Sequence, residues 1–518
     1  MGKLQDSIVS LFNKWNKSYL IFCLVFLPFV IFFAFCKPWE ITYDLWITAA
    51  AVRELSINFF HPSNPIIDLP GYSSPRFVPY TMIWGLFKNI THLNIFTTMG
   101  IAAVTNYFIF IVGLYRFVSR QFKNDSLPVY TFFVMLVIWG TGYGWANAYR
   151  LEMFLINLPY VGFFNFGLSL NALYYLVCYC EKNRRYDLLL YSLLSIIAFI
   201  NHTISGLFCF VAAFAVLLTN VNFKKLILLQ SIPLLAFGIS LFWPYFSYWD
   251  IFIKGTTEVW FKTRLFSHQS RALGLLIVGL PIIIYYALKR KYLLLLYGFL
   301  LCSFIYLFSA FRHIFIGGRF IFFIAFFLHL AMSLFLREHN MLNVKKIVES
   351  FRTNGLIMVF VFTIFIPSIM NRIEEMKLHL KRTVDKPFKI HTYDSPVKPY
   401  LFLSNYLSRS DVLMVDALEG WVIPAITGAR VVAPQKLEPL IVEEVYKRKR
   451  DVASFFKGQL SLEERIALIH TYNVTHIMVN LTNEKDWDPS FRNDLKIIGV
   501  EKARSNEIVL YSFAEKHK

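Results

Sequence analysis

Cysteine is scarce in this sequence. Six cysteines occur among 518 residues, and none of them lies in the last 200. Disulfide bonds therefore cannot hold the C-terminal part of the chain together, and no spacing typical of a zinc site occurs. The glycine-rich phosphate-binding motifs GxxxxGKS/T and GxGxxG are also absent. The sequence thus offers no motif for a metal or a nucleotide, and we expect neither a metal nor a cofactor.

Charged residues are also few. Only 16% of the residues are charged, whereas 56% are hydrophobic and 18% are aromatic, and the mean hydropathy is +0.50. One globular core cannot hide that much apolar surface, so we expect a lipid bilayer to be the solvent. The net charge of +19 does not indicate nucleic acid binding. Much of the positive charge lies in short clusters between apolar segments, as in the cytoplasmic loops of membrane proteins.

Long apolar segments predict about eleven membrane-spanning helices, since one span needs about 20 apolar residues. The predicted spans are 19–37, 94–116, 128–141, 158–178, 187–201, 203–220, 225–246, 272–288, 292–310, 314–336 and 354–370. Two of them, 128–141 and 187–201, are short by this rule. The sequence therefore predicts a mostly α-helical, polytopic transmembrane bundle.

Basic residues set the predicted orientation, because they favour the cytoplasmic side of a membrane. If Lys3, Lys14 and Lys17 are cytoplasmic, the basic clusters of five later loops fall on the same side. These clusters are Arg116, Arg120 and Lys123; Lys182, Arg184 and Arg185; Lys224 and Lys225; Lys289, Arg290 and Lys291; and Arg337, Lys345, Lys346 and Arg352. We therefore predict a transmembrane domain, 1–370, and an extracytoplasmic domain, 371–518. The expected location is a bacterial inner or plasma membrane, as part of the cell envelope.

The first predicted outer loop, about 38–93, is unusually long. Its residues 45–60 mix apolar side chains with polar ones such as Arg53 and Glu54, which predicts an amphipathic helix in the membrane interface. A proline-rich, turn-rich segment follows. It leads into a short apolar stretch, 77–87, which is a candidate re-entrant segment.

The polar C-terminal part predicts a small α/β domain. Residues 412–415 and 476–479 are short apolar runs typical of buried strands, and 495–500 and 508–513 predict further strands, paired as a closing hairpin. Residues 461–472 have helical spacing, and they open with a serine followed three residues later by a glutamate. That pattern is a capping box, which marks the start of a helix.

Asp44 is the most informative acidic residue, because a charge placed near hydrocarbon is costly without a purpose. It lies just after the first predicted span, four residues after Glu40. A carboxylate there can act as a general base toward an acceptor hydroxyl. The alternative is structural, since aspartate is a favoured N-cap residue and the amphipathic helix begins directly after it.

Basic residues on the predicted outer face form a second candidate group. Arginine binds phosphate through two parallel hydrogen bonds, and histidine or lysine adds charge. The group comprises Arg53, Arg76, Arg150, His202, Lys262, Arg264, His268, Arg312, His313 and Arg319. The alternatives are ordinary pairing with Glu152, Asp250 or Glu258, or extension of these side chains to the lipid headgroups. Arg312 and Arg319 flank a Gly-Gly pair at the mouth of a span, which favours them, whereas His202 lies in a short turn where a structural hydrogen bond is the simpler explanation.

Several local sequences resemble the GT-C glycosyltransferases, integral membrane enzymes that take sugars from polyprenyl-phosphate donors. The segments are YDLWITAAAVREL…HPSNPI (43–66), YRLEMFLINLPYVGFFNFGLSL (149–170), NHTISGL (201–207) and GGRFIFFIAFFLHLA (317–331). The order of features is similar too: a cytoplasmic N-terminus, an acidic residue in a long first outer loop, many spans and an external C-terminal domain. The resemblance implies a GT-C-like bundle of about eleven spans with a small extracytoplasmic α/β domain.

By this resemblance Asp44 is the catalytic residue that deprotonates the acceptor hydroxyl. Candidates for binding the donor phosphate are Arg264, Arg312, Arg319 and His202, and candidates for the acceptor or the surrounding loops are Glu40, Glu54, Arg150, Glu152, His268 and His313. Two features depart from the class. Asp44 stands alone, where many members have two adjacent acidic residues, so metal dependence is not implied. The WWD-type motif of the oligosaccharyltransferase branch is absent, which argues against protein N-glycosylation.

The implied activity is inverting transfer of a sugar from a polyprenyl-phosphate donor to a glycan, lipid or protein acceptor on the extracytoplasmic face. Membrane lipids are the other expected partners. A transporter or flippase of lipid-linked sugars would also have many spans, but the sequence shows no internal repeat, and such a protein has little need of an external domain of about 150 residues. A polysaccharide polymerase or ligase is a further alternative, although those usually have their large outer loop late in the chain.

Overall fold

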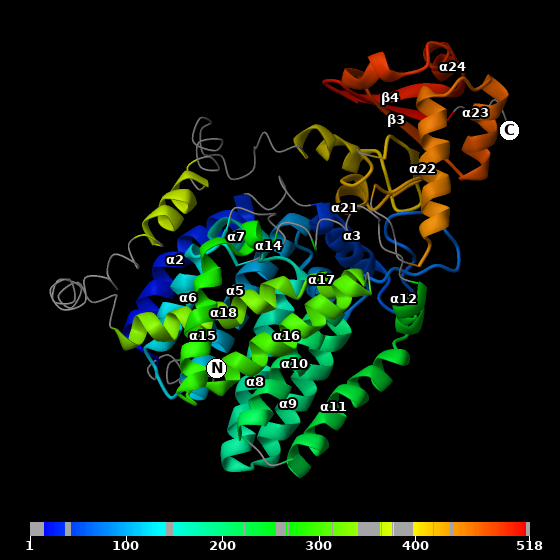
Figure 1. The fold of residues 1–518 in the computed structure, drawn as a ribbon. Coiled ribbons are helices and arrows are strands. Elements are labelled where there is room, and N and C mark those ends of the chain that lie inside the picture. Colours follow the sequence, from blue (N-terminus) through cyan, green and yellow to red (C-terminus); the bar gives the residue numbers. More distant parts are fainter. Residues whose placement is uncertain are drawn as a thin grey trace. The chain divides into compact units, whose positions relative to one another are not determined.

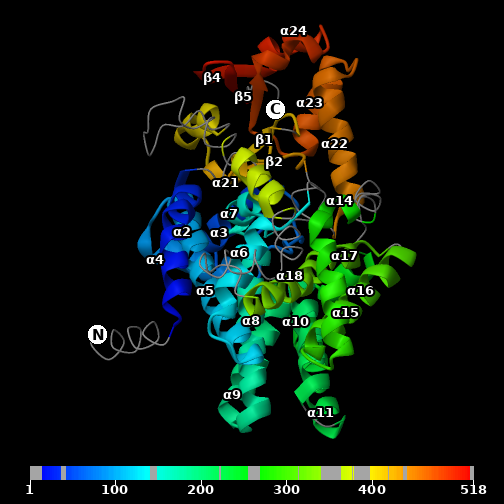
Figure 2. The ribbon, with the colours of Figure 1, turned by 60° about the vertical axis from the view of Figure 1, so that its left-hand side comes forward.

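The structure is a computed structural model (Figures 1 and 2). It describes residues 15–36, 43–140, 149–220, 223–254, 266, 269–312, 314–339, 363, 365–375, 377, 397–417, 419–435 and 440–513. The chain divides into two compact units, and each unit combines segments that are distant in the sequence. The first unit falls within Met1–Ala34, Ala103–Ser240 and Thr257–Phe388, and the second within Phe35–Ala102, Leu241–Thr256 and Lys389–Lys518.

The first unit is a bundle of helices. Those that lie wholly or mostly in it are α2 (Lys17–Cys36), α5 (Ile95–Phe122), α6 (Leu127–Val137), α7 (Leu151–Asn157), α8 (Val161–Lys182), α9 (Arg185–Asn201), α10 (Thr203–Asn220), α11 (Phe223–Leu241), α14 (Gln269–Leu273), the 3-10 helix η1 (Gly274–Val278), α15 (Gly279–Leu288), α16 (Leu293–Phe311), α17 (Phe315–Gly318) and α18 (Ile321–Glu338). Helices α8, α9 and α10 pack against one another, as Figure 2 shows.

Seven helical segments in the described part of the chain are long and apolar enough to cross a membrane. Two shorter apolar helices, Leu127–Val137 and Leu226–Leu241, accompany them. Every predicted span up to 314–336 coincides with a helical segment, and 354–370 lies mostly outside the described residues. The chain is an integral membrane protein, and the predicted mostly α-helical polytopic fold is confirmed.

Aromatic side chains fill the interior of the first unit, which accounts for much of the phenylalanine in the sequence. The ring of Phe110 lies 5.8 Å from that of Phe132, 5.4 Å from that of Phe154 and 5.8 Å from that of Phe166, measured between centroids. All four side chains are buried. The first two pairs are edge-on and the third is stacked, and pairs of either kind add about 0.5–1.5 kcal/mol each beyond the burial of their surface.

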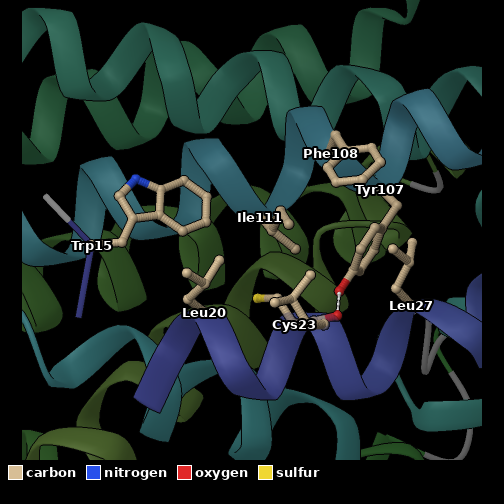
Figure 3. A pocket seen from close by; sticks show the side chains of 8 residues that line it. Trp15, Leu20, Cys23, Leu27, Tyr107, Phe108 and Ile111 are labelled. Atoms are coloured by element: carbon tan, nitrogen blue, oxygen red, sulfur yellow. Dashed lines mark hydrogen bonds between the residues drawn. The ribbon is translucent and has the colours of Figure 1, made fainter. Parts of the chain in front are cut away.

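Polar groups inside the bundle bond to backbone carbonyls. The Asn106 amide donates to the carbonyl of Leu158 at 2.7 Å, and the Tyr107 hydroxyl donates to the carbonyl of Cys23 at 2.8 Å. Figure 3 shows the second bond, at the wall of an apolar groove between α2 and α5 that Phe108 and Ile111 also line. Bonds of this kind link neighbouring helices at a depth where water cannot compensate a lost partner.

The second unit begins with the first predicted outer loop, which forms α3 (Tyr43–Ile57) and α4 (Pro79–Thr91). The two helices cross closely at Gly85, where an added Cβ would lie 2.7 Å from the Cβ of Leu55. A helix is present where the amphipathic helix was predicted, as α3, but its apolar and polar residues are not separated onto two faces. Its Glu54 is not directed to solvent either, because this residue is only 5% exposed. The predicted re-entrant stretch is mostly α4, a helix of 13 residues.

A second connection belongs to the same unit. It includes α12 (Tyr248–Lys254) and is attached to the first loop by two aromatic side chains. The indole of Trp243 donates to the carbonyl of Phe77 at 2.8 Å, and the hydroxyl of Tyr245 donates to the carbonyl of Phe59 at 2.9 Å. Both bonds anchor backbone that has no regular secondary structure.

The C-terminal part of the second unit is built on a five-stranded sheet in the order β2-β1-β3-β5-β4. Its strands are β1 (Val412–Met414), β2 (Arg430–Val431), β3 (His476–Asn480), β4 (Gly499–Ser505) and β5 (Ile508–Phe513). Strands β1, β2 and β3 are parallel, whereas β5 is antiparallel to β3 and β4. The helical elements are η2 (Lys398–Asn405), α21 (Ile423–Thr427), α22 (Val442–Lys457), α23 (Leu462–Thr471), η3 (Leu481–Asp486) and α24 (Phe491–Ile498).

Side chains that alternate along the strands bury both faces of the sheet. On one face, Met414 and Ile477 pack with residues of α22, α23 and α24, such as Phe455. On the other face, Leu413 and Met478 pack with residues of η2 and α21 and with three isoleucines of the first loop, Ile47, Ile66 and Ile67. The period of two residues that defines a strand thus separates the two layers of the core.

The predicted strands at 412–415, 476–479 and 508–513 are confirmed as β1, β3 and β5, and the predicted closing hairpin is formed by β4 and β5. The capping box is confirmed as well, because the Ser461 hydroxyl accepts from the Glu464 N–H at 3.2 Å. The strand predicted at 495–500 is wrong for most of its length. Residues 495–498 belong to α24, where Phe491, Leu495 and Ile498 recur at helical spacing and are buried, and the last two residues of the stretch begin β4.

Candidate functional site

Asp44 lies in the first turn of α3. Its carboxylate is 39% exposed, so a substrate can reach it. The start of the helix is held by the Thr48 hydroxyl, which donates to the carbonyl of Asp44 at 2.9 Å. The N-terminal end of a helix carries partial positive charge, which favours an ionised carboxylate at this position. The local structure thus presents an accessible acid at the start of a helix.

Arg76 is the charged partner of Asp44. Its Nη2 lies 3.7 Å from Asp44 Oδ1, and its side chain is 28% exposed. A tight turn fixes its backbone: the Arg76 N–H donates to the Ser74 hydroxyl at 3.2 Å, and the Thr81 hydroxyl donates to the Arg76 carbonyl at 2.6 Å. In the sequence, Arg76 was one of a broad group of basic candidates and was not singled out. Its position in the proline-rich turn, which must fold back toward the start of α3, could have identified it as a partner of Asp44.

Replacing Arg76 with alanine is expected to lower the turnover of any reaction that Asp44 catalyses by roughly 10- to 100-fold. The carboxylate would lose the cation that orients it, and a misplacement of about 1 Å can cost that much. The check is the kcat and donor KM of Arg76→Ala beside Arg76→Lys, which retains the charge. A raised donor KM at unchanged kcat would instead assign Arg76 to donor binding.

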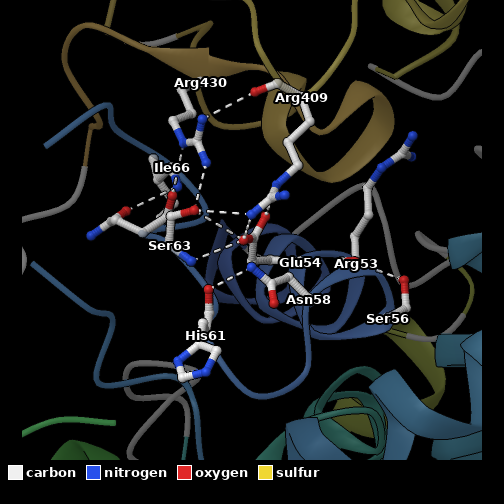
Figure 4. A network of polar contacts seen from close by, with 10 residues as sticks. Arg53, Glu54, Ser56, Asn58, His61, Ser63, Ile66, Arg409 and Arg430 are labelled. Atoms are coloured by element: carbon white, nitrogen blue, oxygen red, sulfur yellow. Dashed lines mark hydrogen bonds and ion pairs between the residues drawn. The ribbon is translucent and has the colours of Figure 1, made fainter. Parts of the chain in front are cut away.

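Glu54, also predicted as a site residue, lies in the last turns of α3 and is buried against the C-terminal part of the same unit. Its carboxylate accepts from Arg409 Nε at 2.9 Å and from the Ser63 N–H at 2.9 Å, as Figure 4 shows. A carboxylate engaged in this way has little capacity left for a substrate. Asp44 and Glu54 are therefore carried by one helix but have different surroundings.

Arg150 and Glu152 are paired with each other in the first unit. Arg150 Nη2 lies 3.5 Å from Glu152 Oε2, and Arg150 Nη1 lies 3.4 Å from Glu375 Oε1. Glu375 in turn pairs with Arg372 at 2.8 Å. These four largely buried side chains join α7 to the helical residues 365–375. Ordinary pairing, the alternative stated for this arginine, is thus what the structure shows.

The candidates for the donor phosphate that the structure describes are all in the first unit. Arg312 is exposed directly after α16, and Arg319 is half-buried between α17 and α18. The His202 ring lies between α9 and α10, with Nδ1 2.9 Å from the Ser205 hydroxyl. Phosphate binding by these residues stays a prediction. Glu40, Arg264, His268 and His313 lie outside the described residues.

A second polar cluster lies at the carboxyl ends of β1 and β3, in the C-terminal part of the chain. The Glu419 carboxylate accepts from the Asn480 amide at 2.8 Å and from the Asn483 amide at 3.1 Å. Burial, with the nearby Asp416 carboxylate, raises the pKa of Glu419 above its usual value. The carboxyl edge of parallel strands is where open α/β sheets usually bind ligands. Among the described residues, no group of three or more His, Cys, Asp or Glu side chains could hold a metal.

His476 forms a charged junction at the opposite end of β3. Its Nδ1 lies 3.4 Å from Asp411 Oδ1, and its Nε2 lies 3.0 Å from Lys502 Nζ. An ammonium group only donates hydrogen bonds, so Nε2 must accept and the ring must be neutral. Burial lowers the pKa of His476 below 6.5, and Lys502 lowers it further against the opposing effect of Asp411.

The stability of the C-terminal part is therefore expected to fall as the pH decreases through about 6.5. The folded state binds a proton at His476 more weakly than the unfolded state does, so acidification favours unfolding. The check is amide hydrogen exchange in β3 at about pH 7.5 and about pH 5.5, after correction for intrinsic exchange rates. In His476→Gln this difference should shrink, and an equal difference in both proteins would contradict the assignment.

No family model and no curated protein matches the sequence. Solved structures do match it. The oligosaccharyltransferase of Archaeoglobus fulgidus in the apo form has a TM-score of 0.54 at 11% identity, covering 96% of this chain and 74% of that one. The same organism's oligosaccharyltransferase AglB in complex with an inhibitory peptide and a dolichol-phosphate has a TM-score of 0.52 at 11% identity, with the same coverage. ArnT from Cupriavidus metallidurans in the apo state has a TM-score of 0.53 at 11% identity, covering 96% of this chain and 98% of that one.

These similar structures are GT-C superfamily membrane glycosyltransferases. The chain therefore has the GT-C fold, a multi-span helical part together with a C-terminal domain, and the predicted resemblance is confirmed at the level of the fold. An identity of 11% carries no residue roles from those proteins to this one.

Proposed function

We propose that this chain is a membrane glycosyltransferase that moves a sugar from a polyprenyl-phosphate donor to a glycan, lipid or protein acceptor. The observation that carries the proposal is the accessible Asp44 carboxylate at the start of α3, paired with Arg76 in a chain that has the GT-C fold. The likeness to an oligosaccharyltransferase solved with a dolichol-phosphate supports a lipid-phosphate donor. We place the reaction on the extracytoplasmic face, from the positive charge of the alternate loops.

Asp44 takes the proton from the acceptor hydroxyl. The acceptor oxygen forms a bond to the anomeric carbon of the sugar from the face opposite the phosphate, while the bond from that carbon to the phosphate oxygen breaks. Both electrons of the broken bond leave with polyprenyl phosphate, so the configuration at the anomeric carbon is inverted. A phosphate leaves without a proton near neutral pH, so a single carboxylate suffices, unlike the two that a hydrolase uses.

Arg312 and Arg319 are the proposed ligands of the donor phosphate, with Arg264 and His202 as further candidates. Arginine fits this role because its planar side chain donates two parallel hydrogen bonds to phosphate oxygens. The acceptor is proposed to contact the cluster around Glu419, whose fixed carboxylate and neighbouring amides suit hydroxyl groups as well as a peptide.

The test uses purified protein in lipid nanodiscs with a panel of radiolabelled polyprenyl-phosphate sugars and membrane extracts as acceptors. The proposal expects label to move from one donor into an acceptor, with the product anomer opposite to that of the donor by NMR. Retention of the donor anomer would overturn the single-step mechanism. If no donor loses its sugar, but the same protein reconstituted in sealed liposomes moves labelled lipid across the bilayer, the chain is a transporter of lipid-linked sugars.

A further inference from the structure

Helix α3 links the proposed base to the C-terminal part of the second unit. Asp44 lies in its first turn and Glu54 ten residues later, a rise of about 15 Å along the axis. Glu54 forms a two-pronged ion pair with Arg409: Nε lies 2.9 Å from Oε2, and Nη2 bonds to Oε1. Such a fork fixes both position and angle, which one point charge does not. Arg409 thus binds the last turns of α3, and Asp44 lies in the first turn of the same helix.

Arg430, in strand β2, stabilises the same contact. Its three donor nitrogens bond to the Asn64 carbonyl at 3.1 Å, the Arg409 carbonyl at 3.0 Å and the Ser63 hydroxyl at 2.9 Å. Ser63 in turn donates its N–H to Glu54 (Figure 4). The two arginines therefore bind the helix and the segment that follows it, and Arg430 also bonds to the backbone of Arg409, so that all of them form one connected network.

The segment after α3 also joins the sheet itself. The N–H of Val431, in β2, donates to the carbonyl of Ile66 at 2.7 Å, which covers the edge of the sheet. Arg448 in α22 donates to the carbonyl of Asp68 at 3.1 Å. Ile66 and Ile47 lie in the same apolar cluster as Leu413. Apolar packing and the polar network thus hold the same helix against the same sheet.

We infer that Arg409 is a positioning residue for sugar transfer. Through its ion pair with Glu54, it holds α3, and therefore Asp44, in a fixed position relative to the C-terminal sheet. This inference rests on the proposed function, because it assigns Arg409 a role in that reaction. Glu54, predicted from sequence as an acceptor or loop residue, becomes part of the positioning device. An acceptor held by the C-terminal part is then held by the same unit as the base that deprotonates it.

The test compares Arg409→Gln and Arg409→Lys with the parent protein in nanodiscs. Arg504→Gln is the matched control, because it removes an exposed two-pronged pair with Glu501, at 3.0 and 2.8 Å, from the same part of the chain. Arg409→Gln should lower kcat by about 10- to 100-fold at unchanged donor KM. Hydrogen exchange should rise in α3 while β3 stays protected. Arg409→Lys retains the charge but cannot form two parallel hydrogen bonds, so its kcat should lie between that of the parent and that of Arg409→Gln.

Two results separate this inference from the proposed function. If Arg409→Gln loosens α3 but leaves kcat unchanged, or leaves α3 as protected as in the parent, the positioning role is wrong although the enzyme stands. If Asp44→Asn transfers sugar as fast as the parent, the catalytic assignment is wrong, and with it the reason for positioning α3. If Arg409→Gln fails to fold, Glu54→Gln can replace it, because this variant gives Arg409 an uncharged partner. The measurements are again kcat and hydrogen exchange in α3.

Discussion

Asp44→Asn is expected to lower the rate of sugar transfer by roughly 10²- to 10⁴-fold, the usual contribution of a general base. The amide has nearly the same shape and can still occupy the start of α3, but it cannot take a proton. Binding of the donor should change little, since the proposed ligands of its phosphate are arginines and not Asp44. The measurement is kcat and donor KM in nanodiscs, with hydrogen exchange of α3 to verify that the helix stays folded.

The matched control for this prediction is Asp68→Asn. Asp68 lies in the same loop, and its backbone carbonyl accepts a hydrogen bond from Arg448 in the C-terminal part. Both variants remove one negative charge from the same region, so a general electrostatic effect would lower transfer equally in both. A loss confined to Asp44→Asn supports the assigned base, and equal losses would contradict it.

Arg465→Met is expected to destabilise the C-terminal part by about 3–5 kcal/mol, the usual cost of breaking a buried ion pair from one side. The Arg465 side chain is 0% exposed, lies 3.3 Å from Asp488 and also pairs with Asp494. Its Nε donates to the carbonyl of Phe455 at 3.1 Å. Methionine can fill the volume, but it would leave two carboxylates without their common cation.

This loss is measured by amide hydrogen exchange in β3, which reports the free energy of opening of the sheet. The comparison is Arg492→Met, which removes an arginine that is 55% exposed and pairs with Glu484. Exposed pairs contribute about 0–1 kcal/mol, so the control should stay close to the parent. If Arg465→Met were as stable as the control, the network around Arg465 would have no stabilising role.

Local patterns explain what could be predicted from the sequence. The apolar spans, the Ser461 capping box and strands β1, β3 and β5 depend on neighbours within one element, so a single sequence is enough to infer them. Asp44 was also singled out from local context, as an acid between a span and a helix, and its catalytic role stays a prediction. The misassigned stretch 495–500 shows the limit of that approach, because short apolar runs suit a helix and a strand alike.

Long-range partners explain what could not be predicted. Glu54 and Arg409 are 355 residues apart, and neither local sequence indicates that the two side chains form a pair. The same holds for Ile66, which covers the edge of a sheet formed more than 340 residues later. Strand β2 has only two residues, too few to show any period. Such contacts depend on the tertiary fold, so their residues looked like ordinary loop charges and apolar positions.

Transfer of a sugar from a lipid phosphate yields two products, so we would count both of them in one reaction. Purified protein in sealed proteoliposomes is given a donor labelled in the sugar and in the lipid. Glycosylated acceptor and free polyprenyl phosphate should appear in equal amounts, and both should fall together in Asp44→Asn. Donor that crosses the bilayer with its sugar still attached, at the same rate in both proteins, would contradict the proposed transfer.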